Sequence, residues 1–224
     1  MNGTKRVLGI LSVALSCAAL PVRAEGDTDE SLRQLSAQWW QWAFSIPAAT
    51  NPLVDGTGAN CMIGQRGPVW FLAGTFTGST PVARNCTVPE GAALFFPVIN
   101  SFAINAPDCD GRAFSVAELR AQTAAVIDQA TDLSVLLDNG PVKQLRRVRS
   151  MVFATTFPRG DVLGAPCIVP GQLYSPSVDD GWYVKLRGLA AGQHTLSIRG
   201  AAGGAALDVF YMLNVVKVAA KDLN

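Results

Sequence analysis

Histidine is almost absent from this sequence, since His194 is the only one in 224 residues. A catalytic Ser-His-Asp or Cys-His set must therefore use His194, and the sequence has no Gly-x-Ser-x-Gly elbow to supply a nucleophile. A zinc site at His194 would need carboxylate or thiolate partners that the sequence does not place beside it. We expect His194 to begin a strand after a glycine turn and to fill a hydrogen-bonding position there. The sequence assigns no catalytic residue and favours a protein that is not an enzyme.

An excess of charge of either sign is also missing. The chain has 18 basic and 17 acidic residues, and removing the three basic residues of segment 1–24 leaves 15 basic against 17 acidic, a net charge of about −2. The only basic cluster is Arg146, Arg147 and Arg149. Proteins that bind nucleic acid usually display a basic stripe or patch. We therefore expect no nucleic-acid partner.

Long apolar runs are confined to the N-terminus. Residues 7–20 are almost entirely apolar, two basic residues precede them, and Val22 and Ala24 place small side chains before Glu25. This pattern predicts a secretion signal over residues 1–24. No later run approaches the roughly 20 residues of a membrane-spanning helix, so we expect no transmembrane segment in the mature chain.

The N-terminus allows a second interpretation, in which residues 14–17 form a lipoprotein cleavage box and Cys17 carries an acyl chain. The leucine before Ser16 fits such a box poorly. We therefore expect a periplasmic or secreted protein, with membrane tethering through Cys17 as the alternative.

Removal of Cys17 with the signal would leave four cysteines: Cys61, Cys86, Cys109 and Cys167. None forms the Cys-x-x-Cys pair that is typical of redox and zinc sites. An even number of cysteines in an exported chain predicts disulfide bonds. Four cysteines allow three pairings, which the sequence does not decide, and we favour Cys61 with Cys86 and Cys109 with Cys167.

Two helices are expected. Apolar residues recur at helical spacing over residues 31–45, and Pro47 forbids continuation of that helix. Ser115 and Glu118 form a capping box at the start of a second helix over residues 115–131.

The remaining chain has the pattern of short strands separated by turn residues. Pro97 is expected at a sheet edge or a bulge, because proline cannot donate to a strand ladder. Asn139 and Gly140 would supply the left-handed backbone of a tight hairpin. We predict one domain over residues 25–224, mainly β with two helices, in which antiparallel sheets form a sandwich of the jelly-roll or immunoglobulin-like type. The expected strands cover residues 69–73, 92–99, 133–137, 142–148, 152–157, 182–186, 194–198 and 207–218.

Tryptophan is plentiful for a chain with so few catalytic candidates, and five are present. Trp39 and Trp42 share the leucine stripe of the first helix and are expected in the core. Trp40 and Phe44 lie on the flank of that stripe, so we expect them to be partly exposed. An exposed Trp40 is a candidate for stacking on a sugar ring.

Asp179 and Asp180 are neighbouring carboxylates close to Trp182. Adjacent residues on a strand point to opposite faces, so the two are not placed as the catalytic pair of a glycosidase. We expect a solvated turn at this place. Trp40, Asp179, Asp180 and Trp182 form the candidate binding set.

Asp108 and Asp110 precede Gly111, and Asn105 lies shortly before them. This crowding of oxygen ligands resembles part of a calcium loop, although no glutamate falls at the distance of the usual bidentate ligand. The alternative is a turn in which these side chains bond the local backbone. Calcium bound by Asp108 and Asp110 is the one metal hypothesis, and no other cofactor is expected.

Several phrases of the sequence together resemble a family of exported bacterial proteins without an established activity. The resemblance implies a secreted or periplasmic domain and carries over no catalytic residue. The last strands are also similar to those of immunoglobulin-like and jelly-roll modules, which says little about a ligand. The phrases are residues 39–43, 67–74, 86–89 and 192–196, with Phe95-Phe96-Pro97.

These patterns predict an exported, non-catalytic binding domain whose ligand is a carbohydrate or another envelope component. One alternative is a hydrolase that works through carboxylates or a metal held by Asp108 and Asp110. A second alternative is a structural protein of the envelope.

Overall fold

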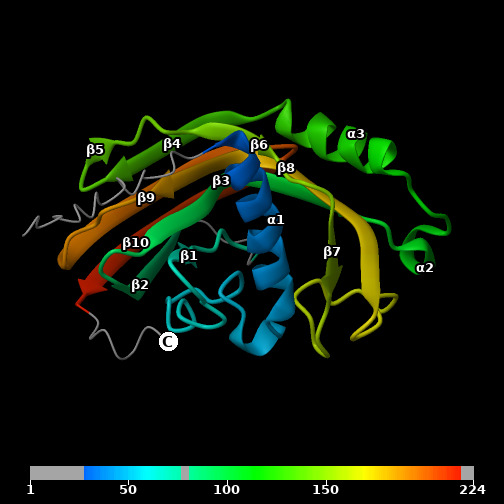
Figure 1. The fold of residues 1–224 in the computed structure, drawn as a ribbon, viewed down its shortest axis with the longest axis horizontal. Coiled ribbons are helices and arrows are strands. Elements are labelled where there is room, and N and C mark those ends of the chain that lie inside the picture. Colours follow the sequence, from blue (N-terminus) through cyan, green and yellow to red (C-terminus); the bar gives the residue numbers. More distant parts are fainter. Residues whose placement is uncertain (1–27, 77–80, 218–224) are drawn as a thin grey trace, which may run out of the picture.

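The computed structural model describes residues 28–76 and 81–217, and the expected secretion signal with Cys17 lies outside them. The described residues form three α-helices, a short 3-10 helix and ten strands in two five-stranded sheets (Figure 1). The helices are α1 Asp29–Ser45, α2 Pro107–Asp110 and α3 Val116–Ile127, with the 3-10 helix at Ala48–Thr50. The strands are β1 Val69–Phe71, β2 Val82–Pro89, β3 Ala93–Ile104, β4 Thr131–Leu137, β5 Gly140–Pro141, β6 Arg146–Arg149, β7 Phe153–Thr156, β8 Leu173–Leu186, β9 Gly192–Ala202 and β10 Ala205–Val216.

Both sheets are mixed. The first has the order β1-β3-β8-β6, with β7 also paired to β8, and the second has the order β2-β10-β9-β4-β5. The pairs β1·β3 and β2·β10 are parallel, and the other pairs are antiparallel. A mainly β domain is therefore confirmed, whereas wholly antiparallel sheets are not, and α2 adds a third helix. The jelly-roll or immunoglobulin-like type stays a prediction.

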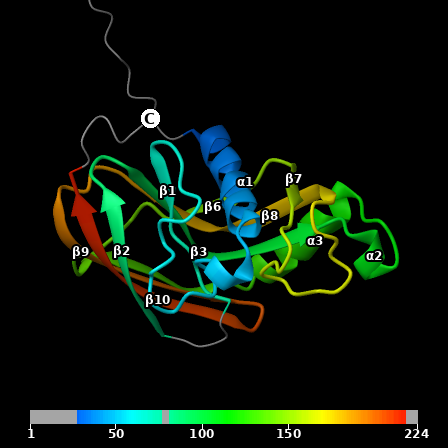
Figure 2. The same ribbon diagram turned by 90° about the horizontal axis from the view of Figure 1, so that it is seen from below.

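The two sheets share a hydrophobic core. Phe96 and Val98 of β3 belong to the same buried cluster as Ile198 of β9 and Tyr211 of β10. At Gly200 of β9 the sheets approach so closely that a Cβ atom would lie 2.6 Å from a backbone oxygen of β3. Figure 2 shows the second sheet, to which β9 and β10 belong, beside the first sheet, to which β3 belongs. The absence of a side chain at Gly200 therefore permits the close contact.

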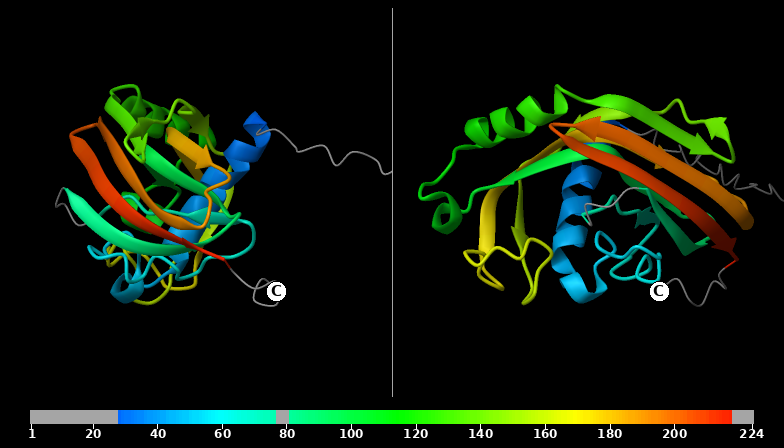
Figure 3. Two further views of the ribbon diagram at one scale, coloured as in Figure 1. Left: turned by 90° about the vertical axis from the view of Figure 1, so that its left-hand side faces the viewer. Right: turned by 180° about the vertical axis from the view of Figure 1, so that it is seen from behind.

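Helices α1 and α3 lie on opposite faces of the first sheet (Figures 1 and 3). On one face, Phe95 and Tyr183 belong to the buried cluster that contains the α1 side chains. On the other face, Leu119 of α3 packs with Ala103 and Val178. The strand side chains alternate between these two helices, which is why β8 carries buried residues on both of its faces.

The flank of α1 is buried, which corrects the expectation that Trp40 and Phe44 are partly exposed. Trp40 is 1% exposed and Phe44 is 0% exposed. The Trp40 ring lies 4.5 Å from that of Phe102 on β3, and the Phe44 ring lies 4.8 Å from that of Phe157. Because α1 lies between the sheet and the loops that follow β7, more than one side of it is covered. Trp39 is in the core, as predicted.

Two local expectations of backbone geometry can be compared with the structure. Pro97 lies at a register shift between β3 and β8, as the bulge expectation required. Asp138 and Asn139 adopt positive φ values of 49° and 65° between β4 and β5. The left-handed turn is thus present, shifted by one residue from Asn139-Gly140, because Gly140 already pairs with Leu137.

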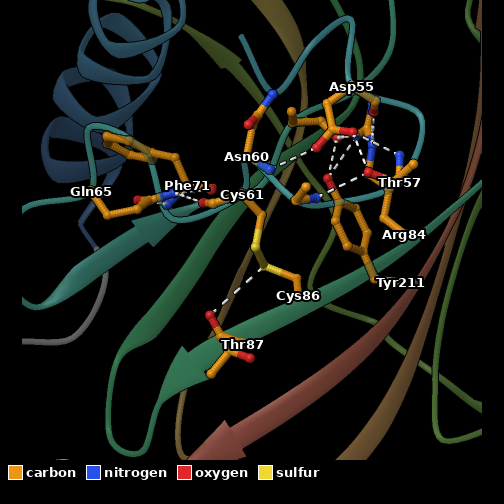
Figure 4. The surroundings of a disulfide bond; sticks show 12 residues. Asp55, Thr57, Asn60, Cys61, Gln65, Phe71, Arg84, Cys86, Thr87 and Tyr211 are labelled. Carbon is orange, nitrogen blue, oxygen red and sulfur yellow. Dashed lines mark hydrogen bonds between the residues drawn. A yellow bond between two sulfur atoms is a disulfide. The ribbon is translucent and has the colours of Figure 1, made fainter. Parts of the chain in front are cut away.

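The favoured disulfide pairing is confirmed, with bonds Cys61–Cys86 and Cys109–Cys167. The first ties the loop before β1 to β2 (Figure 4). Beside it, Arg84 is 2% exposed and donates to the backbone oxygen of Asp55 at 2.7 Å and to the hydroxyl of Tyr211 at 2.8 Å. The bond and the buried arginine together hold this loop against the second sheet.

Candidate functional site

A groove of about 820 Å³ lies between α1, α3 and strand β6. Strand β6 is an edge strand, because within the described residues it pairs only with β8. We call this hollow the arginine groove, because arginine is its commonest lining residue. Its main side chains are Arg33 from α1, Arg120 from α3, Arg146, Arg147 and Arg149 from β6, and Trp182 from β8.

The register of β6 on β8 places the groove residues. Arg147 lies opposite Trp182, and Arg149 lies opposite Asp180. Side chains alternate along a strand, so these four share the face that looks toward α3, whereas Arg146 belongs to the other face. The groove therefore extends over both faces of the edge strand.

Asp180 is the buried acid beneath the arginines, with an exposure of 1%. It accepts hydrogen bonds from Nε and Nη2 of Arg147 at 3.0 and 2.9 Å and from Nε of Arg149 at 3.2 Å. Arg147 also pairs with Asp128 at 2.7 Å. The hydrogen bonds that Arg147 donates to Asp180 raise the pKa of Arg147 above its usual value. Asp180 is therefore a fixed counter-charge that holds two arginines in place.

Arg33 and Arg120 cover the end of the edge strand. Arg33 donates from Nε to the backbone oxygen of Arg149 at 3.2 Å. Arg120 donates to the backbone oxygens of Asp179, at 3.1 Å, and of Ser150. Burial lowers the pKa of Arg120, and the positive charge of Arg33 lowers it further. Both arginines thus use backbone acceptors.

Asp179 lies on the opposite face of β8 and is fully buried. Its Oδ1 accepts from Nε1 of Trp40 at 2.7 Å and from the hydroxyl of Tyr183 at 2.8 Å, whereas Oδ2 has no hydrogen-bond partner among the described residues. Burial raises its pKa to about 8, although the bonds from Trp40 and Tyr183 act in the other direction. The expectation of a solvated turn at Asp179 and Asp180 is therefore wrong.

The candidate binding set divides into two pairs. Trp40 and Asp179 are hydrogen-bonded in the core beside α1, whereas Asp180 and Trp182 share the other face of β8, opposite Arg149 and Arg147. Of the four, Trp182 lines the arginine groove. Trp40 borders a smaller hollow of about 220 Å³ together with Asn100.

His194 has a partner at both ring nitrogens. Nδ1 lies 2.7 Å from Oδ2 of Asp138, and Nε2 lies 3.0 Å from the backbone oxygen of Ala190. Asp138 also accepts from the backbone N–H of Thr195 at 2.8 Å. The hydrogen-bonding position predicted for His194 is confirmed, and its ring joins the β4–β5 turn to β9.

Asp108 and Asp110 lie exposed on the short helix α2, next to the disulfide at Cys109. Asn105 donates to the backbone oxygen of Ser175 and accepts from the N–H of Phe114. No group of three or more His, Cys, Asp or Glu side chains that would hold a metal occurs among residues 28–76 and 81–217.

Comparison of the chain with protein-family models, with curated proteins and with solved structures finds no match. The resemblance to exported bacterial proteins stays a prediction. In the part of the chain that the structure describes, no helix is long and apolar enough to cross a membrane. Fold and groove together define a disulfide-bonded, mainly β domain with a cationic groove at a sheet edge.

The sequence signalled part of this groove. The sequence has one basic cluster, formed by Arg146, Arg147 and Arg149. This cluster bears on nucleic-acid binding, but it does not by itself predict a ligand site. Arg33 and Arg120 belong to two helices that are far apart in the sequence, and nothing local in the sequence connects them with β6. A useful signal was the spacing of Arg147 and Arg149, which places both on one face of a strand.

Proposed function

We propose that the protein is an exported, non-catalytic binding domain whose ligand, a carbohydrate or another envelope component, binds in the arginine groove. The observation that carries this proposal is the half-buried Trp182 within a groove of about 820 Å³. Hollows of this size hold small ligands, and an indole ring offers the flat apolar surface on which a sugar ring stacks. The two disulfides support export to an oxidising compartment, periplasmic or extracellular. We also propose that the two sheets pack as a sandwich, which their common core supports.

Binding suits the groove better than hydrolysis does. A general acid or base exchanges a proton with the substrate during the reaction. Asp180, the carboxylate beneath the groove, has both oxygens occupied by hydrogen bonds from Arg147 and Arg149, so it does not face a substrate. Asp179 is the carboxyl with the raised pKa, but it points into the core on the other face of β8.

A glycan array followed by tryptophan-fluorescence titration tests the proposal. We expect at least one oligosaccharide to bind and Trp182→Phe to weaken that binding by about tenfold, because stacking area is lost. Trp70→Phe is the matched control, since Trp70 is another half-buried tryptophan that packs against the same core cluster. An array without a ligand, or equal effects of the two substitutions, contradicts the carbohydrate version. Co-purification of an envelope protein in that case favours the structural alternative.

A further inference from the structure

We propose that the ligand of the arginine groove is an acidic oligosaccharide that crosses the edge strand, with its carboxylates bound by Arg146 on one face and by the neighbouring arginines on the other, where a sugar ring lies against Trp182. This inference rests on the proposed function and names the class of its ligand. It depends on three observations: the distribution of charge around the groove, the backbone groups at the end of β6 that are already hydrogen-bonded, and the Trp182 ring in the groove.

Positive charge is accessible in the groove, whereas Asp180 beneath it is not. Asp128 and Glu30, the ion-pair partners of Arg147 and Arg33, are exposed at 61% and 70%. Five arginines line it, and Asp29 is the only acid among its lining residues. Asp180 is 1% exposed, whereas the side chains of Arg33 and Arg149 are 48% and 59% exposed. A ligand entering the groove therefore meets guanidinium groups, with their internal counter-charge beneath them.

Two of the five arginines form no ion pair with a carboxylate of the described residues. Within the described residues Arg146 makes no ion pair, and Arg120 is bonded to backbone oxygens only. Arg33 contacts the carboxylate of Glu30, at a long distance of 3.8 Å between Nη1 and Oε2. Burial lowers the pKa of Arg120, and the positive charges of Arg33 and Arg149 lower it further. This repulsion between like charges falls when an anion binds between them. The groove thus offers free guanidinium donors, which bind carboxylates through two parallel hydrogen bonds.

The sheet edge favours a ligand that is recognised by side chains over an extended acidic peptide. A peptide that adds to a sheet needs unpaired backbone groups along the edge strand. Beside the groove, the oxygen of Arg149 accepts from Arg33, the oxygen of Ser150 accepts from Arg120, and the N–H of Met151 donates to the oxygen of Arg33. The end of β6 is therefore already capped, whereas the guanidinium groups and the Trp182 ring remain available.

Matched pairs of saccharides test the inference without changing the protein. The probes are uronate oligosaccharides from pectin, alginate and hyaluronan, each compared with its carboxyl-reduced, neutral counterpart of the same length. We expect the acidic member of at least one pair to bind about tenfold more tightly by tryptophan fluorescence, because charged hydrogen bonds are stronger than neutral ones. The preference should shrink between about 50 mM and about 500 mM NaCl, as surface charges become screened.

Substitutions assign the preference to the groove. Arg146→Gln is expected to weaken binding of the acidic saccharide about tenfold and of the neutral one much less, while Arg146→Lys is intermediate because the forked donor is lost. Arg146 is exposed and makes no ion pair with the described residues, so its replacement spares the fold. Arg159→Gln is the control. Arg159 is exposed in the loop after β7, and its replacement changes the net charge of the protein by the same amount as Arg146→Gln.

The possible results separate this inference from the proposed function. Equal, salt-insensitive binding of acidic and neutral saccharides overturns the inference and leaves the binding function in place. Equal losses in Arg146→Gln and Arg159→Gln also overturn it, as does binding of oligodeoxythymidylate at the affinity of the saccharides. If no saccharide of either kind binds, both the inference and the carbohydrate function are wrong.

Discussion

His194 is held between two acceptors, the carboxylate of Asp138 and the backbone oxygen of Ala190. Neutral imidazole has one N–H group, so only the charged ring donates to both acceptors. The Asp138 hydrogen bond is the main cause that raises the pKa of His194, and the same contact lowers the pKa of Asp138. Stabilisation from this contact is therefore complete below the unfolded pKa of about 6.5 and is lost as pH rises through the folded value.

The single histidine makes this contact directly measurable. We expect an NMR titration of the His194 ring to give a pKa above about 6.5, the value of a free imidazole. Asp138→Asn should bring that pKa down toward the free value, since it removes the negative partner. A histidine pKa that is unchanged by Asp138→Asn contradicts the prediction.

The contribution of Asp179 to folding stability falls as pH rises, which is the opposite of what a carboxylate with a lowered pKa does. Burial raises its pKa to about 8, so between about pH 4 and pH 8 the folded protein holds a proton that the unfolded chain releases. Its contribution to stability is therefore lost as pH rises through that window. Asp179→Asn keeps an acceptor for Trp40 and Tyr183 but cannot ionise.

We expect Asp179→Asn to raise the free energy of unfolding relative to the natural chain by roughly 1 to 3 kcal/mol at about pH 8, with a smaller gain at about pH 5. Urea denaturation at both pH values measures the difference. Asp180→Asn is the control on the other face of β8, and it should destabilise the protein at both values because Arg147 and Arg149 lose their buried partner. A pH-independent effect of Asp179→Asn argues against the raised pKa.

At the scale of single elements, the start of α3 has a complete capping box. The Ser115 hydroxyl accepts from the N–H of Glu118, and the Glu118 carboxylate accepts from the N–H and hydroxyl of Ser115. These bonds from Ser115 lower the pKa of Glu118 to about 2. We expect Ser115→Ala to cost about 1 kcal/mol of unfolding free energy in a urea titration, because an N–H at the helix start loses its acceptor. An unchanged midpoint contradicts this role.

The elements also show what the sequence was able to predict. The start of the second helix was correctly predicted from Ser115 and Glu118, because a capping box lies within four residues of chain. Its predicted end at residue 131 is wrong, since α3 ends at Ile127 and Thr131 begins β4. Strand β8 was predicted only from Trp182 onward, because Asp179-Asp180-Gly181 has the composition of a turn. The strand continues through these acids because each has a distant partner, which no local pattern reveals.

The burial of Trp40 was missed for a similar reason. Helical periodicity identifies one buried stripe, and Trp40 lies beside it. The second covered side of α1 is created by Phe102 of β3 and by the chain after β7, whose positions depend on the order of strands in the sheet. The groove depends on the same order, since it exists only because β6 is left at the edge.

At the scale of the whole molecule, the two disulfides close loops of different lengths in different surroundings. Cys61–Cys86 spans 25 residues and Cys109–Cys167 spans 58. Loop-closure entropy alone gives the longer bridge the larger effect, about 4.2 against about 3.5 kcal/mol. Burial has the opposite effect, because Cys61 and Cys86 are 6% and 3% exposed in the core shared by the sheets, whereas Cys109 is exposed.

We expect loss of the buried Cys61–Cys86 bridge to lower the free energy of unfolding more than loss of the Cys109–Cys167 bridge, although the second bridge has the larger entropic effect. Replacing Cys61 and Cys86 by alanine leaves a cavity at the common core and releases the loop before β1, so roughly 1 to 2 kcal/mol adds to the entropic loss. Replacing Cys109 and Cys167 by alanine removes the entropic term alone, since that bridge lies at the surface beside α2. Urea unfolding of the two double variants should therefore rank the Cys61/Cys86 variant as the less stable. The reverse order would mean that chain entropy dominates, and that the loop around Cys61 is held by Arg84 and its backbone acceptors without the disulfide.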